Sequence, residues 1–180
     1  VRGEALNPDD PDDDLHRRWE VASTSHVDRH LRSGREPLEM RDLGSSVQGR
    51  LASQCHLSEI GTTAPMQHVL AAALDHLVSW TLDGTPPPIA PRLTRSSDGA
   101  ALVRDADGRS LGGIRLADTV APLGVNMGLN SGPAGCLIQG SFMPYDKKTI
   151  RRLYGNRASY LKAVTRAALQ SVDDGYVLSV

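Results

Sequence analysis

The clearest alternation of apolar and polar positions lies in residues 65–83. Its apolar residues recur at spacings of three, four and seven, which is typical of one face of an amphipathic helix. These residues are Met66, Val69, Leu70, Ala73, Leu74, Leu77 and Val78. A proline fits the first turn of this helix, and Gly84 suits the position just beyond its end. We expect the stripe to pack on a sheet and to bury Leu70, Leu74 and Leu77.

Two further helices are predicted near the end of the chain. A short basic helix covers residues 147–154, and a longer helix covers about 157–173. The inward face of the longer helix is expected to hold Tyr160, Leu161, Val164, Ala168 and Val172. An Asp-Asp-Gly sequence ends it, and the apolar residues 176–180 then predict a last strand.

A short strand is predicted over residues 18–22, because apolar and polar residues alternate there and then give way to small polar residues. A loop follows this strand and carries His26, which we expect to be at least partly exposed. Residues 92–95 and 100–104 predict two more short strands around a Ser-Ser-Asp-Gly turn.

The segment after His26 is harder to interpret. A helix can begin near Val27, but Gly34 and Pro37 are expected to stop it soon. Farther on, the residues between Gly112 and Gly140 are rich in glycine and predict irregular backbone. This stretch lacks the lysine and the spacing of a phosphate-binding loop, and we expect no cofactor.

Composition narrows the classes of function. The chain has 180 residues, which is enough to bury the core of one domain. Its net charge is −1 with acids and bases interspersed, so we expect no nucleic-acid-binding face. No apolar run reaches the roughly 18 residues that span a bilayer, so we expect no membrane partner. The first and last residues read as breaks in a longer protein.

The cysteines and histidines offer little independent chemistry. Cys55 and Cys136 either form one long-range disulfide or remain two separately buried thiols, and they do not fix the compartment. His26 and His30 are four residues apart and could share a helix face as zinc ligands. However, the glutamate of a His-Glu-x-x-His motif is absent and no third ligand is evident, so we predict no metal site.

Several segments, taken in order, resemble a known family. Residues 19–28 read Trp-Glu-Val-Ala-Ser-Thr-Ser-His-Val-Asp and resemble a WEVAGTAHxD segment, with Ser23 in place of its glycine. Asp-Gly-Thr-Pro-Pro-Pro at 83–88 and Gly-Gly-Ile-Arg at 112–115 follow, and then Gly-Cys-Leu-Ile-Gln-Gly at 135–140. The order is similar to the C-terminal part of a poorly characterised bacterial family of α/β-hydrolase-domain proteins, over nearly all of the chain.

The resemblance implies an α/β fold, made of the last core strands and helices of a hydrolase plus a loop-rich extension. Residues 1–83 would be the end of the hydrolase core, 84–145 a loop-rich cap or extension, and 146–180 the C-terminal helices and last strand. The expected function is a serine hydrolase acting on a small-molecule ester, with a triad in the order Ser, Asp or Glu, His. The alternative is a non-catalytic ligand-binding or interaction module on the same scaffold, with its ligand surface on 84–145.

The resemblance assigns only two members of the triad to this chain, the histidine and the acid. His26 stands where the histidine belongs, and Glu4 is the carboxylate nearest to the place of the acid. No Gly-x-Ser-x-Gly sequence occurs in the 180 residues, so the nucleophile is expected upstream of Val1. By itself, the chain is therefore expected to be catalytically inactive.

Overall fold

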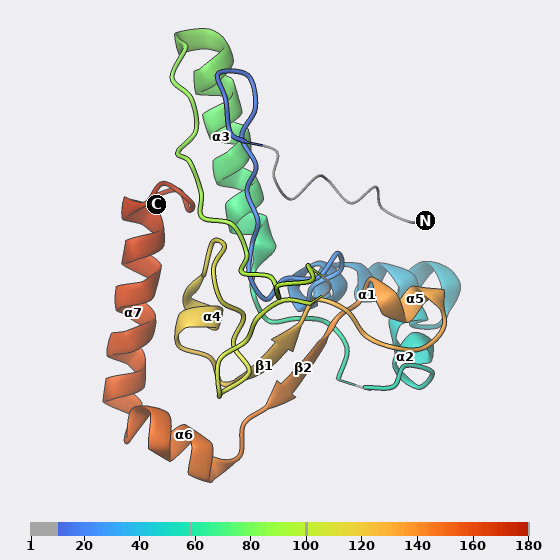
Figure 1. The fold of residues 1–180 in the computed structure, drawn as a ribbon. Helices are drawn as coiled ribbons and strands as arrows, with labels where there is room; N and C mark the ends of the chain where they lie inside the picture. Colours follow the sequence, from blue (N-terminus) through green and yellow to red (C-terminus); the bar gives the residue numbers. More distant parts are fainter. Residues whose placement is uncertain (1–10, 58, 100, 180) are drawn as a thin grey trace.

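The fold is that of a computed structural model, which describes residues 11–57, 59–99 and 101–179 (Figure 1). Helices dominate the regular structure of these residues, and two short strands lie near the centre. In chain order the elements are α1 (Arg29–Leu43), α2 (Val47–Ala52), α3 (Met66–Asp83), α4 (Ala117–Val120), β1 (Gly124–Met127), α5 (Ala134–Leu137), β2 (Ser141–Pro144), α6 (Lys147–Tyr154) and α7 (Arg157–Asp173).

The two strands form an antiparallel pair in which Gly124 faces Pro144 and Met127 faces Ser141. A side chain at Gly124 has no room, because a Cβ atom there would lie 2.3 Å from the Met143 carbonyl oxygen. In the described residues, other strand-like pairing is limited to isolated bridges, including a parallel one between Val21 and Ile114. The sequence predicts irregular backbone here, because four residues per strand are too few to show a clear alternation.

The three predicted helices are present with the expected bounds, but their buried faces differ from the prediction. α3 projects from the body of the molecule, with Arg17 and Trp19 in contact with it, while α7 runs along one side of the molecule and packs on α4 (Figure 1). On α3 only Val69 and Ala72 are buried, and Leu70, Leu74 and Leu77 are 52%, 65% and 51% exposed. The prediction that these leucines pack on a sheet is wrong, because the described residues bring no sheet against that face.

The buried face of α7 also differs from the predicted one. Ala167 and Ser171 are its buried residues, whereas Leu161 and Ala168 of the predicted inward face are exposed. Tyr160, Val164 and Val172 are half-buried, so the prediction is right in part. Small residues point inward because α4 approaches this side of the helix closely.

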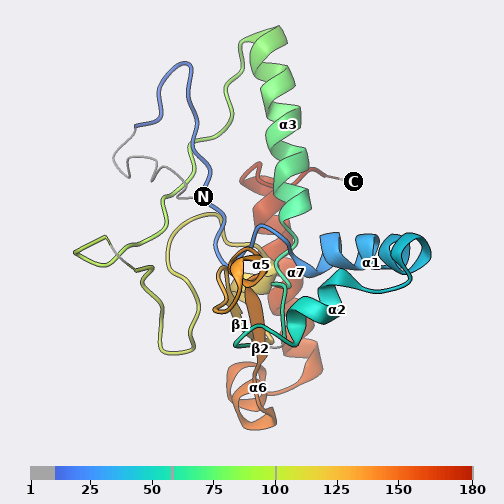
Figure 2. The same ribbon diagram turned by 90° about the vertical axis from the view of Figure 1, so that its right-hand side faces the viewer.

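α1 continues through the two residues that were expected to stop it. The Asp28 carboxylate accepts a hydrogen bond from the Leu31 backbone N–H at 2.7 Å and caps the start of the helix. Gly44 ends it in the left-handed conformation, at φ 65°. Gly34 and Pro37 lie inside, and none of the residues of α1 is buried. Figure 2 shows α1 on the side of the molecule opposite residues 92–112.

Four predicted strands are not regular strands in the structure. Residues 18–22 contribute only the Val21 bridge to Ile114. The predicted hairpin of 92–95 with 100–104 is present as a single antiparallel bridge between Arg95 and Leu102. Residues 176–179 form no strand, because Tyr176 and Val177 donate their N–H groups to the Ser171 carbonyl at the end of α7.

Two small clusters of buried side chains make the core. The first joins Val69, Ala90, Ile114 and Leu116, with Trp19 packed against it. The second contains Ile60 and the disulfide between Cys55 and Cys136, whose Cα atoms lie 5.5 Å apart. Of the two states left open for the cysteines, the disulfide is therefore correct. No helix in the described part of the chain is long and apolar enough to cross a bilayer.

Candidate functional site

His26 lies in an irregular segment between the Val21 bridge and the start of α1. Its side chain is exposed, whereas its neighbours Ser25 and Val27 are buried. Within the described residues no hydrogen bond to the imidazole is present. The expectation of an exposed histidine on a loop is confirmed, although a bridge, not a regular strand, precedes the loop.

The loop is held on both sides of His26 by distant segments. Before it, the Ala22 N–H donates to the Ile114 carbonyl at 2.9 Å. After it, the Val27 N–H donates to the Ile138 carbonyl at 3.1 Å. Beneath it, the hydroxyl groups of Ser25 and Thr62 are 3.0 Å apart and hydrogen-bonded. The imidazole therefore stands on backbone that is fixed at three points.

Ser23 shows why the related segment has a glycine at this position. Its φ is +67°, in the left-handed region that residues with a Cβ atom seldom occupy. Within the described residues it is the one non-glycine residue with positive φ. The turn that leads to His26 therefore keeps the geometry of a glycine turn, even though serine occupies it.

No described residue completes a triad with His26. Glu4 lies outside the described residues. Asp28 is close in sequence, but its carboxylate is buried and caps α1. Ser25 cannot act as an exposed nucleophile, because its hydroxyl is buried and donates to the Val27 carbonyl at 2.9 Å. Among the described residues, no three His, Cys, Asp or Glu side chains are grouped as metal ligands.

A second polar site, which the sequence did not reveal, surrounds Asp118 on α4. Asp118 lines two pockets of about 400 and 340 Å³, both with mainly apolar walls and both bordered by α7. Thr63 stands beside it at the first pocket, and its hydroxyl hydrogen-bonds to the Asp118 side chain. Thr63 is fixed by Asn126, whose carboxamide oxygen accepts its N–H at 2.8 Å and whose amide donates to its hydroxyl at 3.0 Å.

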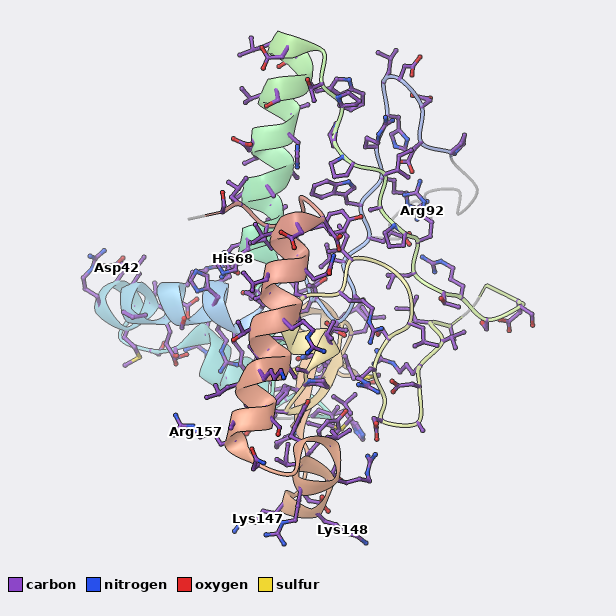
Figure 3. All side chains as sticks on the ribbon, turned by 90° about the vertical axis from the view of Figure 1, so that its left-hand side faces the viewer. Asp42, His68, Arg92, Lys147, Lys148 and Arg157 are labelled. Carbon is purple, nitrogen blue, oxygen red and sulfur yellow. A yellow bond between two sulfur atoms is a disulfide. The ribbon has the colours of Figure 1, made fainter. Side chains whose placement is uncertain are left out.

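Burial is the main influence on the charge of this site. It raises the pKa of the Asp118 carboxyl above its usual value, while the Thr63 hydrogen bond and the nearby His68 act in the opposite direction. His68 lies on α3 where that helix comes next to α7 (Figure 3). Burial and the charge of Asp118 also raise the pKa of Tyr160, which lines the first pocket.

A carboxyl group with a raised pKa beside apolar pockets is suited to proton transfer or to hydrogen bonding with a mainly apolar ligand. The sequence signal for it is weak: one aspartate within Leu-Ala-Asp-Thr-Val at 116–120. Thr63 and Asn126 are 63 residues apart, and only the fold brings them together beside Asp118.

Comparison with known proteins agrees with the resemblance found in the sequence. The family model described as "Alpha/beta hydrolase domain" matches residues 3–180. No curated protein and no solved structure matches the chain. The mixture of helices with a small sheet is compatible with this family, and the place of the chain within the complete fold stays a prediction. The chain belongs to the alpha/beta hydrolase domain family.

Proposed function

We propose that this chain contributes the catalytic histidine, His26, of a serine hydrolase that acts on small-molecule esters. The observation that supports the proposal is an exposed imidazole on a loop that is hydrogen-bonded to three distant segments. A general base needs this combination, because the ring must reach the substrate while its position stays fixed. The nucleophilic serine would be supplied by residues outside these 180, since Ser25 is buried and no Gly-x-Ser-x-Gly occurs.

In this proposal, the neutral imidazole of His26 accepts the proton of the serine hydroxyl as the oxygen attacks the ester carbonyl. It then returns the proton to the leaving alcohol. A carboxylate is needed to orient the ring and to stabilise its cation, and Glu4 remains the candidate for this role. Asp28 is a poorer candidate, because its carboxylate already caps α1.

The test is the hydrolysis of p-nitrophenyl butyrate by the full-length protein with His26→Ala. We expect kcat to fall on the order of 10⁴-fold or more, because proton transfer and alignment are lost together. His30→Ala is the matched control, since His30 is also exposed and lies four residues farther on, in α1. Unchanged turnover in His26→Ala would refute the proposal, as would His26-dependent turnover by the 180 residues alone.

The two pockets at Asp118 favour a second candidate, which is ligand binding without catalysis. Their walls are mainly apolar and a single carboxyl faces both, which is the usual composition of a small-molecule site. Ester turnover separates the candidates. Val164 lines the first pocket, so Val164→Trp should fill it. A full-length protein that binds an apolar compound, loses this binding in Val164→Trp, and hydrolyses no ester would support the binding module.

A further inference from the structure

A third pocket lies at the elbow where α6 leads into α7, and its walls differ from those at Asp118. Its volume is about 630 Å³, within the range of small-molecule sites. Tyr145, Tyr154 and Tyr160 all line it, which is three of the four tyrosines of the chain. His26 is not among its lining residues. Neither the family nor the proposed function accounts for this pocket.

The tyrosine rings are held in place by hydrogen bonds and by contact with each other. The Tyr154 hydroxyl donates to the Pro122 carbonyl at 2.6 Å, and the Tyr145 hydroxyl donates to the Asp107 carbonyl. The rings of Tyr154 and Tyr160 meet edge to face, with centroids 5.1 Å apart. Burial raises the pKa of Tyr154 to about 12, so the phenol stays neutral at ordinary pH. These rings form a fixed, uncharged aromatic wall.

All charged residues that line the pocket are cations. They are Lys147 from α6, Arg151 from the same helix, and Arg157 from the first turn of α7. None of the three forms an ion pair with another described residue. Figure 3 shows Lys147 and Arg157 at the end of the molecule where the two helices join.

The carboxylates of Asp107 and Asp146 are occupied elsewhere. Asp107 binds Arg152, the residue next to Arg151, and also lies 3.6 Å from Arg109. Asp146 precedes Lys147, but its side chain accepts the Thr149 N–H at 2.7 Å and caps α6. None of the described residues lining the pocket is acidic. The chain as a whole carries a net charge of −1, so three cations around one aromatic pocket are a local excess of positive charge.

We propose that this pocket binds a small aryl carboxylate. The aromatic body would lie against the tyrosine rings, and the carboxylate would reach the guanidinium groups of Arg151 and Arg157, which can each bind two oxygens at once. Lys147 adds a mobile third donor. A long polyanion fits less well, because the cations surround one pocket and do not follow a groove.

The test compares two probes that share a ring system, 2-naphthoate and the neutral 2-naphthalenemethanol. Isothermal titration calorimetry on the full chain is expected to give at least about tenfold tighter binding for the carboxylate, because only it forms charge-assisted hydrogen bonds. The double variant Arg151→Gln/Arg157→Gln should lose this difference while binding the alcohol unchanged. Raising the salt from about 20 mM to about 500 mM should weaken the carboxylate alone.

Arg166→Gln is the matched control. Arg166 lies on α7, is exposed, and does not line this pocket, so removing its positive charge should leave naphthoate binding unaltered. Both arginines in the test variant are exposed, and circular dichroism should show an intact fold. Equal affinity for the two probes, no binding of naphthoate, or an equal loss of affinity in Arg166→Gln would each overturn the proposal.

Discussion

The two helices α1 and α3 are mostly exposed to solvent, whereas the irregular segment of residues 22–28 is mostly buried. α1 has no buried residue, and α3 has two among 18. The irregular residues 22–28 contain five buried side chains, which are Ala22, Ser23, Ser25, Val27 and Asp28. Helices α1 and α3 therefore contribute little to the core of this chain. α1 and most of α3 are stabilised mainly by their own hydrogen bonds and caps, whereas much of the core forms where irregular segments from distant parts of the sequence meet.

The contacts between these loops are specific and largely polar. Asn130 illustrates them, because its side chain accepts the Leu57 N–H at 3.2 Å and donates to the Leu57 carbonyl at 2.8 Å. The Asn130 side chain thus pairs with both backbone groups of Leu57, as a neighbouring strand would in a sheet. The parallel bridge between Val21 and Ile114 and the Cys55–Cys136 disulfide connect other pairs of segments. Such a core depends on particular partners more than on apolar area.

The largest expected effect is the loss of the disulfide. The two cysteines are 81 residues apart, and closing a loop of this length stabilises the fold by about 4–5 kcal/mol in the chain-entropy model. We expect Cys55→Ala/Cys136→Ala to lower the free energy of unfolding, measured in urea, by a similar amount. Reduction of the parent protein should reproduce the loss. Equal urea midpoints for the oxidised parent and the variant would show that the loops hold together without the bond.

A pair of apolar truncations tests the difference in burial directly. Ile114 is 1% exposed and packs in the first core cluster, so Ile114→Ala should cost about 2–5 kcal/mol. Leu74 on α3 is 65% exposed, and Leu74→Ala should change stability by less than about 0.5 kcal/mol. Urea denaturation of both variants measures the contrast. A similar loss in both would mean that the outer face of α3 is covered in solution.

A smaller gain in stability is expected from Ser23→Gly. The left-handed conformation at φ +67° costs a residue with a Cβ atom about 1–2 kcal/mol. Glycine avoids this strain but loses about 0.5–1 kcal/mol through greater freedom in the unfolded chain, so the net gain should be near 0.5–1 kcal/mol. Ser25→Gly is the contrast, because it removes a buried hydroxyl with two hydrogen bonds and should destabilise. Thermal denaturation separates the two signs.

The smallest effect concerns the ionisation of Asp118, which is only partly buried. Burial raises the pKa of this carboxyl in the fold, so the folded state favours its neutral form. Its contribution to stability is complete below the unfolded pKa and is lost as pH rises through the folded pKa. Asp118→Asn should therefore match the parent at about pH 3 and become the more stable protein above about pH 5. A difference between the two that does not vary with pH would contradict the role of burial.

The sequence was sufficient to locate three helices but not the surfaces they bury. α3, α6 and α7 have periodic apolar residues. A proline, an aspartate and an asparagine, respectively, precede the first residue of these helices, and a glycine, a glycine and an aspartate follow the last. Periodicity shows that Leu70, Leu74 and Leu77 share a face, but it does not show whether another element covers that face. α1 extends between its caps at Asp28 and Gly44 in spite of Gly34 and Pro37. Local sequence rules do not show whether a helix with such residues continues or ends.

The candidate sites were predictable to different degrees. The small residues around His26 indicated an exposed loop, and the structure agrees. The Asp118 site needs Thr63 and Asn126, and the tyrosine pocket needs Leu123 beside α6 and α7. No local pattern joins such residues, because their contacts arise only when loops of many residues close. Sequence reasoning therefore located the exposed candidate side chain of His26 but could not find the pockets.

The hydrogen bonds that fix the His26 loop also set the order in which the molecule can assemble. The Ala22 N–H bonds to the Ile114 carbonyl, and the Val27 N–H bonds to the Ile138 carbonyl. The loop therefore reaches its final shape only after most of the chain has been brought together. Contacts so distant in sequence slow folding, because the entropy of closing each loop is lost before the contact forms. Helices such as α3 need no such closure. The segment that presents His26 should be among the last parts to become ordered during folding and among the first to be lost when Ile114 or Ile138 is displaced.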